Sequence, residues 1–153
     1  SRLYGNPLDE ELQQEISAFA AQHFSRPGIP FVNWHTLLVL AQQDVGQAAT
    51  FAASVAEQAS QSTTLDQEIV ANLCCAMEMF CREDYAAAAE LFAAAAQSVP
   101  AIGGSNAQRD AIYDSWLTAL LRSGNAGLAL EKLDERSSER AAHLDHDWFS
   151  RLA

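Results

Sequence analysis

The amino-acid sequence predicts an all-α fold of about seven or eight helices. Alanine, the strongest helix former, supplies 29 of the 153 residues, whereas valine and isoleucine together supply 11. β-branched side chains are therefore too few for a sheet. Glycine, proline and helix-capping residues recur at short intervals and divide the chain into helix-sized segments. The length suits one domain, so we expect residues 1–153 to form a single helical domain.

Residues 1–29 are expected to form a leading helix and a linker. Asn6 and Pro7 match an N-cap followed by a first-turn proline. The helix then extends to about Phe24, and prolines at positions 27 and 30 force a non-helical link after it. Its expected apolar face comprises Leu8, Leu12, Ile16, Phe19 and Ala20.

Three helical hairpins are expected to follow, in residues 30–60, 65–100 and 105–138. The segments 64–67 and 105–108 each match a capping box. In this motif a hydroxyl side chain and a glutamine side chain three residues later accept hydrogen bonds from free backbone N–H groups at the start of the helix. Asp84 is expected to cap the second helix of the middle hairpin. A trailing helix is expected in residues 139–153.

The hairpin turns recur at solenoid spacing. Alignment on Asp44, Glu83 and Gly124 gives steps of 39 and 41 residues. The middle hairpin has small, aromatic and proline residues where tetratricopeptide repeats place them: Ala76, Tyr85, Ala88, Phe92, Ala95 and Pro100. The third hairpin departs from this pattern, with Leu117 and Arg136 at positions where small residues are usual. We therefore expect a tetratricopeptide-like right-handed superhelix of α-α hairpins, with a non-repetitive helical bundle as the structural alternative.

The segment Ile102–Asp110 resembles the signature of the tetratricopeptide repeat protein 38 family. In that family a similar Ile-Gly-Gly-Ser-Asn/His-Ala-Gln-Arg-Asp string joins two late helical hairpins. Weaker similarity at Trp34–His35 and at Leu128–Arg136 extends the resemblance to roughly residues 30 to 140. Family members are longer and carry a helical N-terminal portion, so the resemblance implies either an isolated C-terminal domain of such a protein or a short relative of the family. It implies a repeat scaffold and no catalytic residues.

The helix expected in residues 65–82 is apolar on almost every side, which predicts that neighbours surround it. In a tetratricopeptide superhelix the first helix of each hairpin lines the inner surface, and an apolar inner surface suits helix-in-groove recognition. The expected occupant is a protein or peptide, the missing N-terminal region of a longer chain, or a second copy in a homodimer; alternatively the leading helix covers the surface. The candidate partner-binding residues are Phe31, Trp34, Leu38, Val70, Leu73, Met77 and Phe80.

The loop before residue 106 allows two interpretations. Paired glycines before a helix N-terminus, with an arginine one turn later, could hold a carboxylate or a phosphate. The same residues could simply form a tight turn and a helix cap, and the lysine of a phosphate-binding loop is absent from this string. The residues concerned are Gly103, Gly104, Ser105, Asn106, Gln108, Arg109 and Asp110.

Histidines and cysteines offer little for chemistry. His143 and His146 could share a helix face as metal ligands, and His35 could belong to a site, but no sequence neighbour completes either set. We therefore expect no metal, cofactor or catalytic residue. An odd number of cysteines in an apolar stretch favours buried thiols in a reducing, cytoplasmic setting. The three cysteines are Cys74, Cys75 and Cys81.

The net charge of -11 argues against nucleic-acid and anionic-membrane partners. Residues 1–100 hold 12 of the 20 acidic residues and only 3 of the 9 basic ones. The sequence thus predicts a non-catalytic scaffold for protein-protein interaction. The alternative is a small-ligand, metal-binding or enzymatic domain that uses the segment 103–110 or the histidines.

Overall fold

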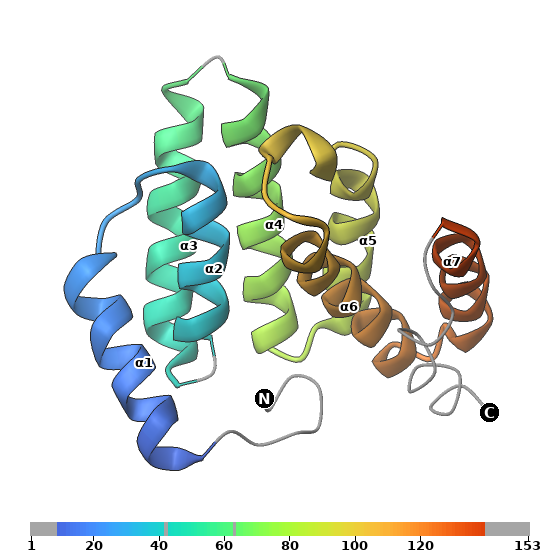
Figure 1. Cartoon of the computed structure of the whole chain (residues 1–153), viewed down its shortest axis with the longest axis horizontal. Helices are drawn as coiled ribbons and strands as arrows, with labels where there is room; N and C mark the ends of the chain where they lie inside the picture. Colours follow the sequence, from blue (N-terminus) through green and yellow to red (C-terminus); the bar gives the residue numbers. More distant parts are fainter. Residues whose placement is uncertain (1–8, 42, 63, 140–153) are drawn as a thin grey trace.

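The computed structural model describes residues 9–41, 43–62 and 64–139, and within these residues the fold contains helices and no strand (Figure 1). The all-α prediction is therefore confirmed. The expected trailing helix lies almost entirely outside the described residues, as do Asn6 and Pro7. The α-helices are α1 (Glu10–His23), α2 (Pro30–Leu40), α3 (Val45–Ser60), α4 (Leu65–Cys81), α5 (Tyr85–Ala96), α6 (Asn106–Arg122) and α7 (Ala126–Glu139), and the 3₁₀ turn η1 (Val99–Ile102) follows α5.

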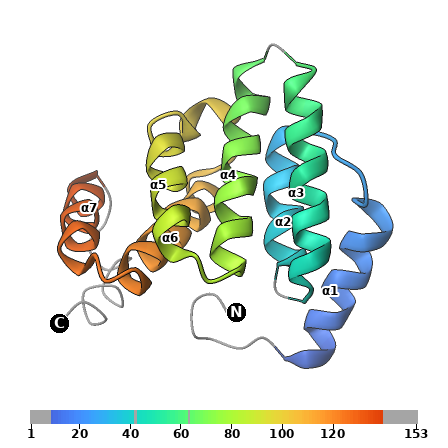
Figure 2. The same ribbon diagram turned by 180° about the vertical axis from the view of Figure 1, so that it is seen from behind.

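Each helix packs against its sequence neighbours, which produces a row of helices with α1 at one end and α7 at the other (Figure 1). α4 lies in the middle of the row, where α2, α3 and α5 all pack against it. The reverse view in Figure 2 shows the same order, with α7 set apart at the end of the molecule. No helix in the described part of the chain is long and apolar enough to cross a bilayer.

Local capping signals account for most of the helix starts. The Asp84 carboxylate accepts a hydrogen bond from the Ala87 N–H at 3.2 Å, as the sequence predicts. The capping box at α6 is complete: the Ser105 N–H donates to Gln108 Oε1 at 3.0 Å, and the Gln108 N–H donates to Ser105 Oγ at 3.3 Å. The predicted capping box at Thr64 is wrong, because the Thr64 hydroxyl pairs with the Ser62 hydroxyl at 3.0 Å instead of the helix end.

The second helices of the three hairpins begin in the same way. The residues that immediately precede them are Asp44, Asp84 and Asn125, at steps of 40 and 41 residues. Four positions further on, the side chain is in each case a fully buried alanine: Ala48, Ala88 and Ala129. The structure thus moves two alignment points by one residue each, from Glu83 to Asp84 and from Gly124 to Asn125. The turns before α5 and α7 also share a left-handed residue, with φ of 64° at Glu83 and 84° at Gly124.

The orientation of α1 differs from the expectation. The apolar side chains Leu12, Ile16 and Phe19 do share one side of the helix, but all three are exposed. Ala20 of the expected face is buried as predicted, together with Ser17, on the side that packs against α2. A small-residue side lets α1 approach α2 closely, and the wider apolar side is left facing outward.

Candidate functional site

The side chains expected to form an open inner surface lie mainly inside the molecule. Trp34, Val70, Leu73 and Met77 are fully buried, and Phe80 is 2% exposed. The last four belong to α4, whose neighbours α2, α3 and α5 enclose it. The expectation of an open apolar surface along α4 is therefore corrected, because a helix that is apolar on all sides is stable only when it is surrounded.

This burial also bears on which partner could cover the apolar side chains of α4. The helices that cover α4 are α2, α3 and α5, whereas the leading helix α1 packs against α2. The α4 side chains proposed for homodimerisation contact the core of their own chain. A second copy could reach them only if the hairpins separated.

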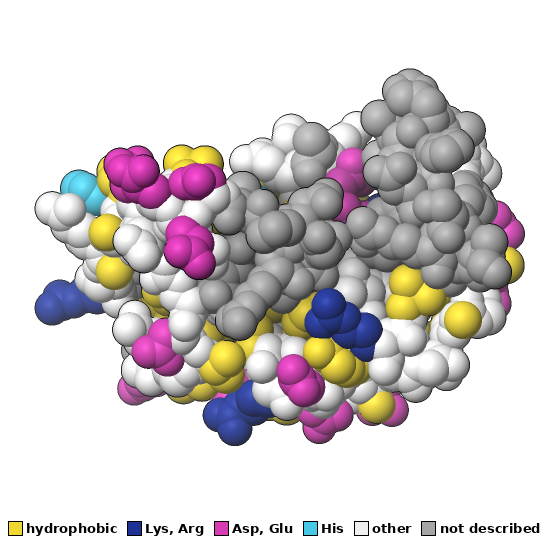
Figure 3. Space-filling view, turned by 90° about the horizontal axis from the view of Figure 1, so that it is seen from below, with side chains coloured by type: hydrophobic (Ala, Val, Ile, Leu, Met, Phe, Trp, Pro, Cys, Tyr) yellow, Lys and Arg dark blue, Asp and Glu magenta, His cyan; other side chains and the backbone are white. Residues whose placement is uncertain are grey.

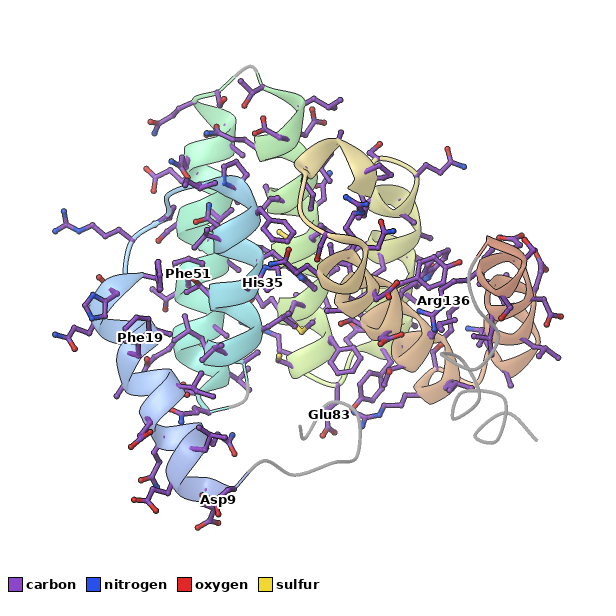
Figure 4. All side chains as sticks on the ribbon, in the orientation of Figure 1. Asp9, Phe19, His35, Phe51, Glu83 and Arg136 are labelled. Carbon is purple, nitrogen blue, oxygen red and sulfur yellow. The ribbon has the colours of Figure 1, made fainter. Side chains whose placement is uncertain are left out.

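The remaining two candidates, Phe31 and Leu38, are half-buried on α2. The Phe31 ring lies 4.4 Å from the His35 ring, centroid to centroid. His35 is a residue of α2 (Figure 4), and its Nδ1–H donates to the Phe31 carbonyl oxygen of the same helix at 3.0 Å. The Phe31 ring also lies close to Gly104, where an added Cβ would be 2.5 Å from the nearest ring atom.

Arg109 holds the glycine loop together. Its Nη1 donates to the carbonyl oxygens of Gly103 and Gly104 at 3.2 and 2.6 Å, and its Nη2 donates to the side chain of Asn106. These bonds support the structural interpretation of the loop, because the guanidinium is turned back onto its own backbone. The loop residues thus fix the entry of the chain into α6.

A cleft of about 500 Å³ opens between α5, η1, α6 and α7. Its volume falls within the roughly 300–1,000 Å³ that is usual for ligand pockets. The structure brings three of the seven loop candidates to this cleft, namely Asn106, Arg109 and Asp110, whereas the other four are not part of its lining. Glu135 and Arg136 complete the polar lining from α7.

The floor of the cleft is aromatic. Phe92 is 1% exposed and Trp116 is 7% exposed, and the Tyr113 ring stands edge-on to Trp116 at 5.4 Å. The Tyr113 hydroxyl donates to the Lys132 carbonyl oxygen at 3.0 Å and so ties α6 to α7. The buried Nε1–H of Trp116 has no acceptor within the described residues. A rigid apolar floor of this kind favours binding of an apolar group.

A buried arginine forms the α7 wall of the cleft. Arg136 is 8% exposed and lies between α6 and α7 (Figure 4). Its Nη1 is 2.8 Å from Asp114 Oδ1, and its guanidinium lies 5.0 Å from the centre of the Tyr113 ring. The ion pair and the aromatic contact fix the side chain, so the wall presents a positioned guanidinium group whose charge Asp114 balances.

The lining of the cleft suits binding better than covalent chemistry. It carries two guanidinium groups, from Arg109 and Arg136, and two carboxylates, from Asp110 and Glu135. Among the described residues that line it, none is a histidine, cysteine, serine or lysine. The cleft therefore offers an apolar floor and hydrogen-bonding groups of both charges, without a nucleophile beside a base.

The three thiols are poorly suited to act as nucleophiles. Burial raises the pKa of Cys74 far above its usual range, and the neighbouring Cys75 adds to the shift. The pKa of Cys75 is raised as well, by burial and then by the charge of Glu78. The same two causes raise the pKa of Cys81 to about 11. All three cysteines are free, and as neutral thiols they serve packing.

Metal ligation finds no support in the described part of the chain, where no three His, Cys, Asp or Glu side chains gather as a metal site would require. The predicted pair His143 and His146 lies outside the described residues. His35, a candidate site residue from the sequence, instead forms the hydrogen bond to the Phe31 carbonyl oxygen described above.

Sequence reasoning missed the cleft because its residues converge from four elements. Tyr113 and Trp116 gave no distinctive signal within an otherwise ordinary helix. Arg136 did give one, since it occupies a position at which the other hairpins carry Val55 and Ala95, both buried and apolar. A charged residue at an apolar register position was thus the available pointer to the cleft wall.

Comparison with known proteins assigns no family: neither a family model, nor a curated protein, nor a solved structure matches the chain. The described residues form an all-helical domain of seven packed helices.

Proposed function

We propose that the protein is a non-catalytic helical scaffold that binds a peptide segment of another protein in the cleft between α5 and α7. The observation that carries this proposal is the cleft itself, which joins a buried aromatic floor to a rim with both charges. An apolar side chain of the peptide would lie on the floor, and its charged or polar neighbours would reach the rim.

The residue types of the cleft support recognition of a protein segment. Tryptophan, tyrosine and arginine dominate the energetics of protein interfaces because they combine a large contact area with directed hydrogen bonds. Here the Tyr113 ring contacts both the Trp116 ring and the Arg136 guanidinium. They are held by α6 and α7, so little side-chain freedom is lost when a partner binds.

We also propose that the three hairpins are related to one another as tetratricopeptide-like repeats. The common helix starts at Asp44, Asp84 and Asn125 and the equivalent buried alanines support three related hairpins. The steps of 40 and 41 residues exceed the usual 34-residue repeat. The loops between hairpins, including the one that contains η1, take up part of the excess. We likewise propose a relation to the tetratricopeptide repeat protein 38 family, on the basis of the segment Ile102–Asp110.

The proposal can be tested by selection from a displayed random-peptide library against the full chain and two variants. Ala96 lines the cleft and is half-buried, so Ala96→Trp should fill the cleft. Ala94 is exposed on the same helix, so Ala94→Trp adds the same side chain elsewhere. We expect the unmodified chain and Ala94→Trp to enrich the same peptides, each with an apolar anchor, and Ala96→Trp to lose them.

The outcome that contradicts the proposal is equal enrichment by both tryptophan variants, or no enrichment by the unmodified chain. Thermal unfolding of each variant, followed by circular dichroism, separates loss of the cleft from loss of the fold. Retained unfolding temperatures with lost binding would place the binding in the cleft.

A small-ligand function is the second candidate, because three residues of the predicted anion loop reach the same cleft: Asn106, Arg109 and Asp110. A thermal-shift screen with small organic anions and divalent metal ions would test it. Stabilisation of the unmodified chain and of Ala94→Trp, but not of Ala96→Trp, would favour this function. Unchanged unfolding temperatures throughout would reject it.

A further inference from the structure

α1 lies at the end of the molecule opposite α7 (Figure 1), and it carries an exposed apolar stripe. We call Leu12, Ile16, Phe19 and Phe24 the α1 stripe; their exposed fractions are 47%, 38%, 57% and 38%. The first three follow an i, i+4, i+7 spacing, which is the spacing that one helix uses to pack on another. The Phe19 and Phe24 rings, 6.0 Å apart, extend the stripe past the helix end.

The way α1 sits on α2 makes this exposure unusual. The helix buries Ser17 and Ala20 while it exposes its larger apolar side chains. The buried Ser17 hydroxyl has no hydrogen-bond partner among the residues that the structure describes. A helix that hides a hydroxyl and exposes leucine and phenylalanine gains little from its own chain, and such local conflicts are typical of binding surfaces.

The surroundings of the stripe are acidic. The N-cap Asp9 and the residues Glu10, Glu11 and Glu15 in the first half of α1 carry exposed carboxylates, and the helix contains no basic residue other than His23. Glu15 lies one helical turn from both Leu12 and Phe19, so it borders the stripe directly. In Figure 3, acidic and hydrophobic side chains lie side by side at the left end, where α1 is located. Figure 4 shows Asp9 at the start of the helix and Phe19 further along it.

We propose that the α1 stripe binds an amphipathic helix of a partner protein in which lysine or arginine side chains flank the apolar ones. The apolar spacing would fit a helical partner, and the acidic edge would pair with the basic flank. A second copy of this chain is a poorer occupant, because it would bring the same carboxylates and a net charge of -11. This inference is independent of the cleft, and together the two surfaces would let the scaffold join two partners.

The test measures binding of two labelled synthetic helical peptides to the full chain by fluorescence anisotropy. Both peptides carry leucines at i, i+4, i+7 and i+11; one has lysines beside them, and the other has glutamates. We expect the lysine peptide to bind at least tenfold more tightly, and more weakly as salt is raised, because screening shortens the reach of the carboxylates. Glu11→Gln with Glu15→Gln should weaken it severalfold.

A matched pair of variants locates the binding. Leu12→Gln with Phe19→Gln should lose at least tenfold in affinity for the lysine peptide. Leu128→Gln with Leu130→Gln removes two leucines on α7, each 41% exposed, and should change nothing. Circular dichroism confirms that all variants remain folded. Equal binding of both peptides, or equal losses in both variant pairs, would overturn the proposal. A doubled mass in light scattering that only the α1 variant abolishes would also overturn it, in favour of a second copy.

Discussion

Replacement of Gly104 with alanine tests the contact that holds the loop before α6, and with it Arg109, in place. Gly104 has a φ of +79°, which alanine adopts with strain. An added Cβ would lie 2.5 Å from Cζ and 2.6 Å from Cε2 of Phe31. Since carbon atoms normally approach to about 3.5–4.0 Å, the Phe31 ring would have to move by about 1 Å.

The expected loss combines three effects. A left-handed alanine costs about 1–2 kcal/mol, and the stiffer unfolded chain offsets about 0.4–1 kcal/mol of this. Displacement of the Phe31 ring adds about 1–3 kcal/mol, which is typical of overpacking. Gly104→Ala should therefore lower the free energy of unfolding by about 1–4 kcal/mol. Gly124→Ala, with a φ of +84° and nothing within 4 Å of its Cβ, should lack the overpacking contribution.

Urea unfolding followed by circular dichroism at 222 nm provides the measurement for both glycine variants, for Phe31→Leu, and for Gly104→Ala combined with Phe31→Leu. Leucine lacks the ring atoms that the new Cβ would meet. The double variant should therefore be more stable than the sum of its single changes implies, by at least about 1 kcal/mol. Equal losses from the two glycine substitutions, or strict additivity with Phe31→Leu, would refute the reasoning.

Three further predictions concern other parts of the chain. Glu83→Gly should raise the free energy of unfolding by about 0.5–1 kcal/mol in urea titrations, because Glu83 has a left-handed φ of 64° that glycine adopts without strain. Asp114→Ala should lower it by about 1–3 kcal/mol in the same assay, since it removes the carboxylate that pairs with the buried Arg136 guanidinium at 2.8 Å. Cys81 should react with iodoacetamide at pH 8 about a hundredfold more slowly than an ordinary thiol, because its pKa is raised from 9.0 to about 11. Its unfolded form ionises first, so stability should fall as the pH rises from 9 towards 11.

Each of these predictions has a matched control. Glu83→Ala keeps the left-handed strain and should give no gain, so an equal gain would remove the backbone explanation. Asp134→Ala removes an exposed carboxylate on α7 and should leave stability nearly unchanged; an effect as large as that of Asp114→Ala would contradict the ion-pair argument. Cys81 labelled in denaturant should react at the ordinary rate, and equally slow labelling there would show that the fold is not the cause.

The helices could be predicted because their starts are encoded locally. Asp84 and the Ser105–Gln108 pair cap their helices through residues only three positions apart, so the sequence contains the whole interaction. The failure at Thr64 shows the limit of such signals, because the nearby Ser62 hydroxyl competes for the same group. The sequence predicts Ala20 on the packed side of α1 but not the burial of Ser17, since close packing of these small residues against α2 overrides the apolar pattern.

The cleft lies beside the hairpin whose buried positions differ most from those of the other two hairpins. At three equivalent positions the first two hairpins bury an apolar side chain, whereas the third buries a polar one. In the order of the hairpins, these positions hold Trp34, Cys74 and Ser115; Leu37, Met77 and Thr118; and Val55, Ala95 and Arg136. The two hydroxyls bond to carbonyl oxygens of their own helix, Ser115 to Ala111 at 2.8 Å and Thr118 to Asp114 at 2.7 Å, so their burial carries little penalty.

Arg136 cannot be accommodated in that way, because a guanidinium needs both more space and an opposite charge. Its ion pair with Asp114 and its contact with the Tyr113 ring place a long side chain between α6 and α7. At the equivalent position of the middle hairpin, the small side chain of Ala95 lets α4 and α5 pack closely. The resulting separation of α7 leaves the space that Phe92 and Trp116 line. An arginine at a position that is apolar in the other two hairpins thus coincides with the cleft and adds a guanidinium group to its wall.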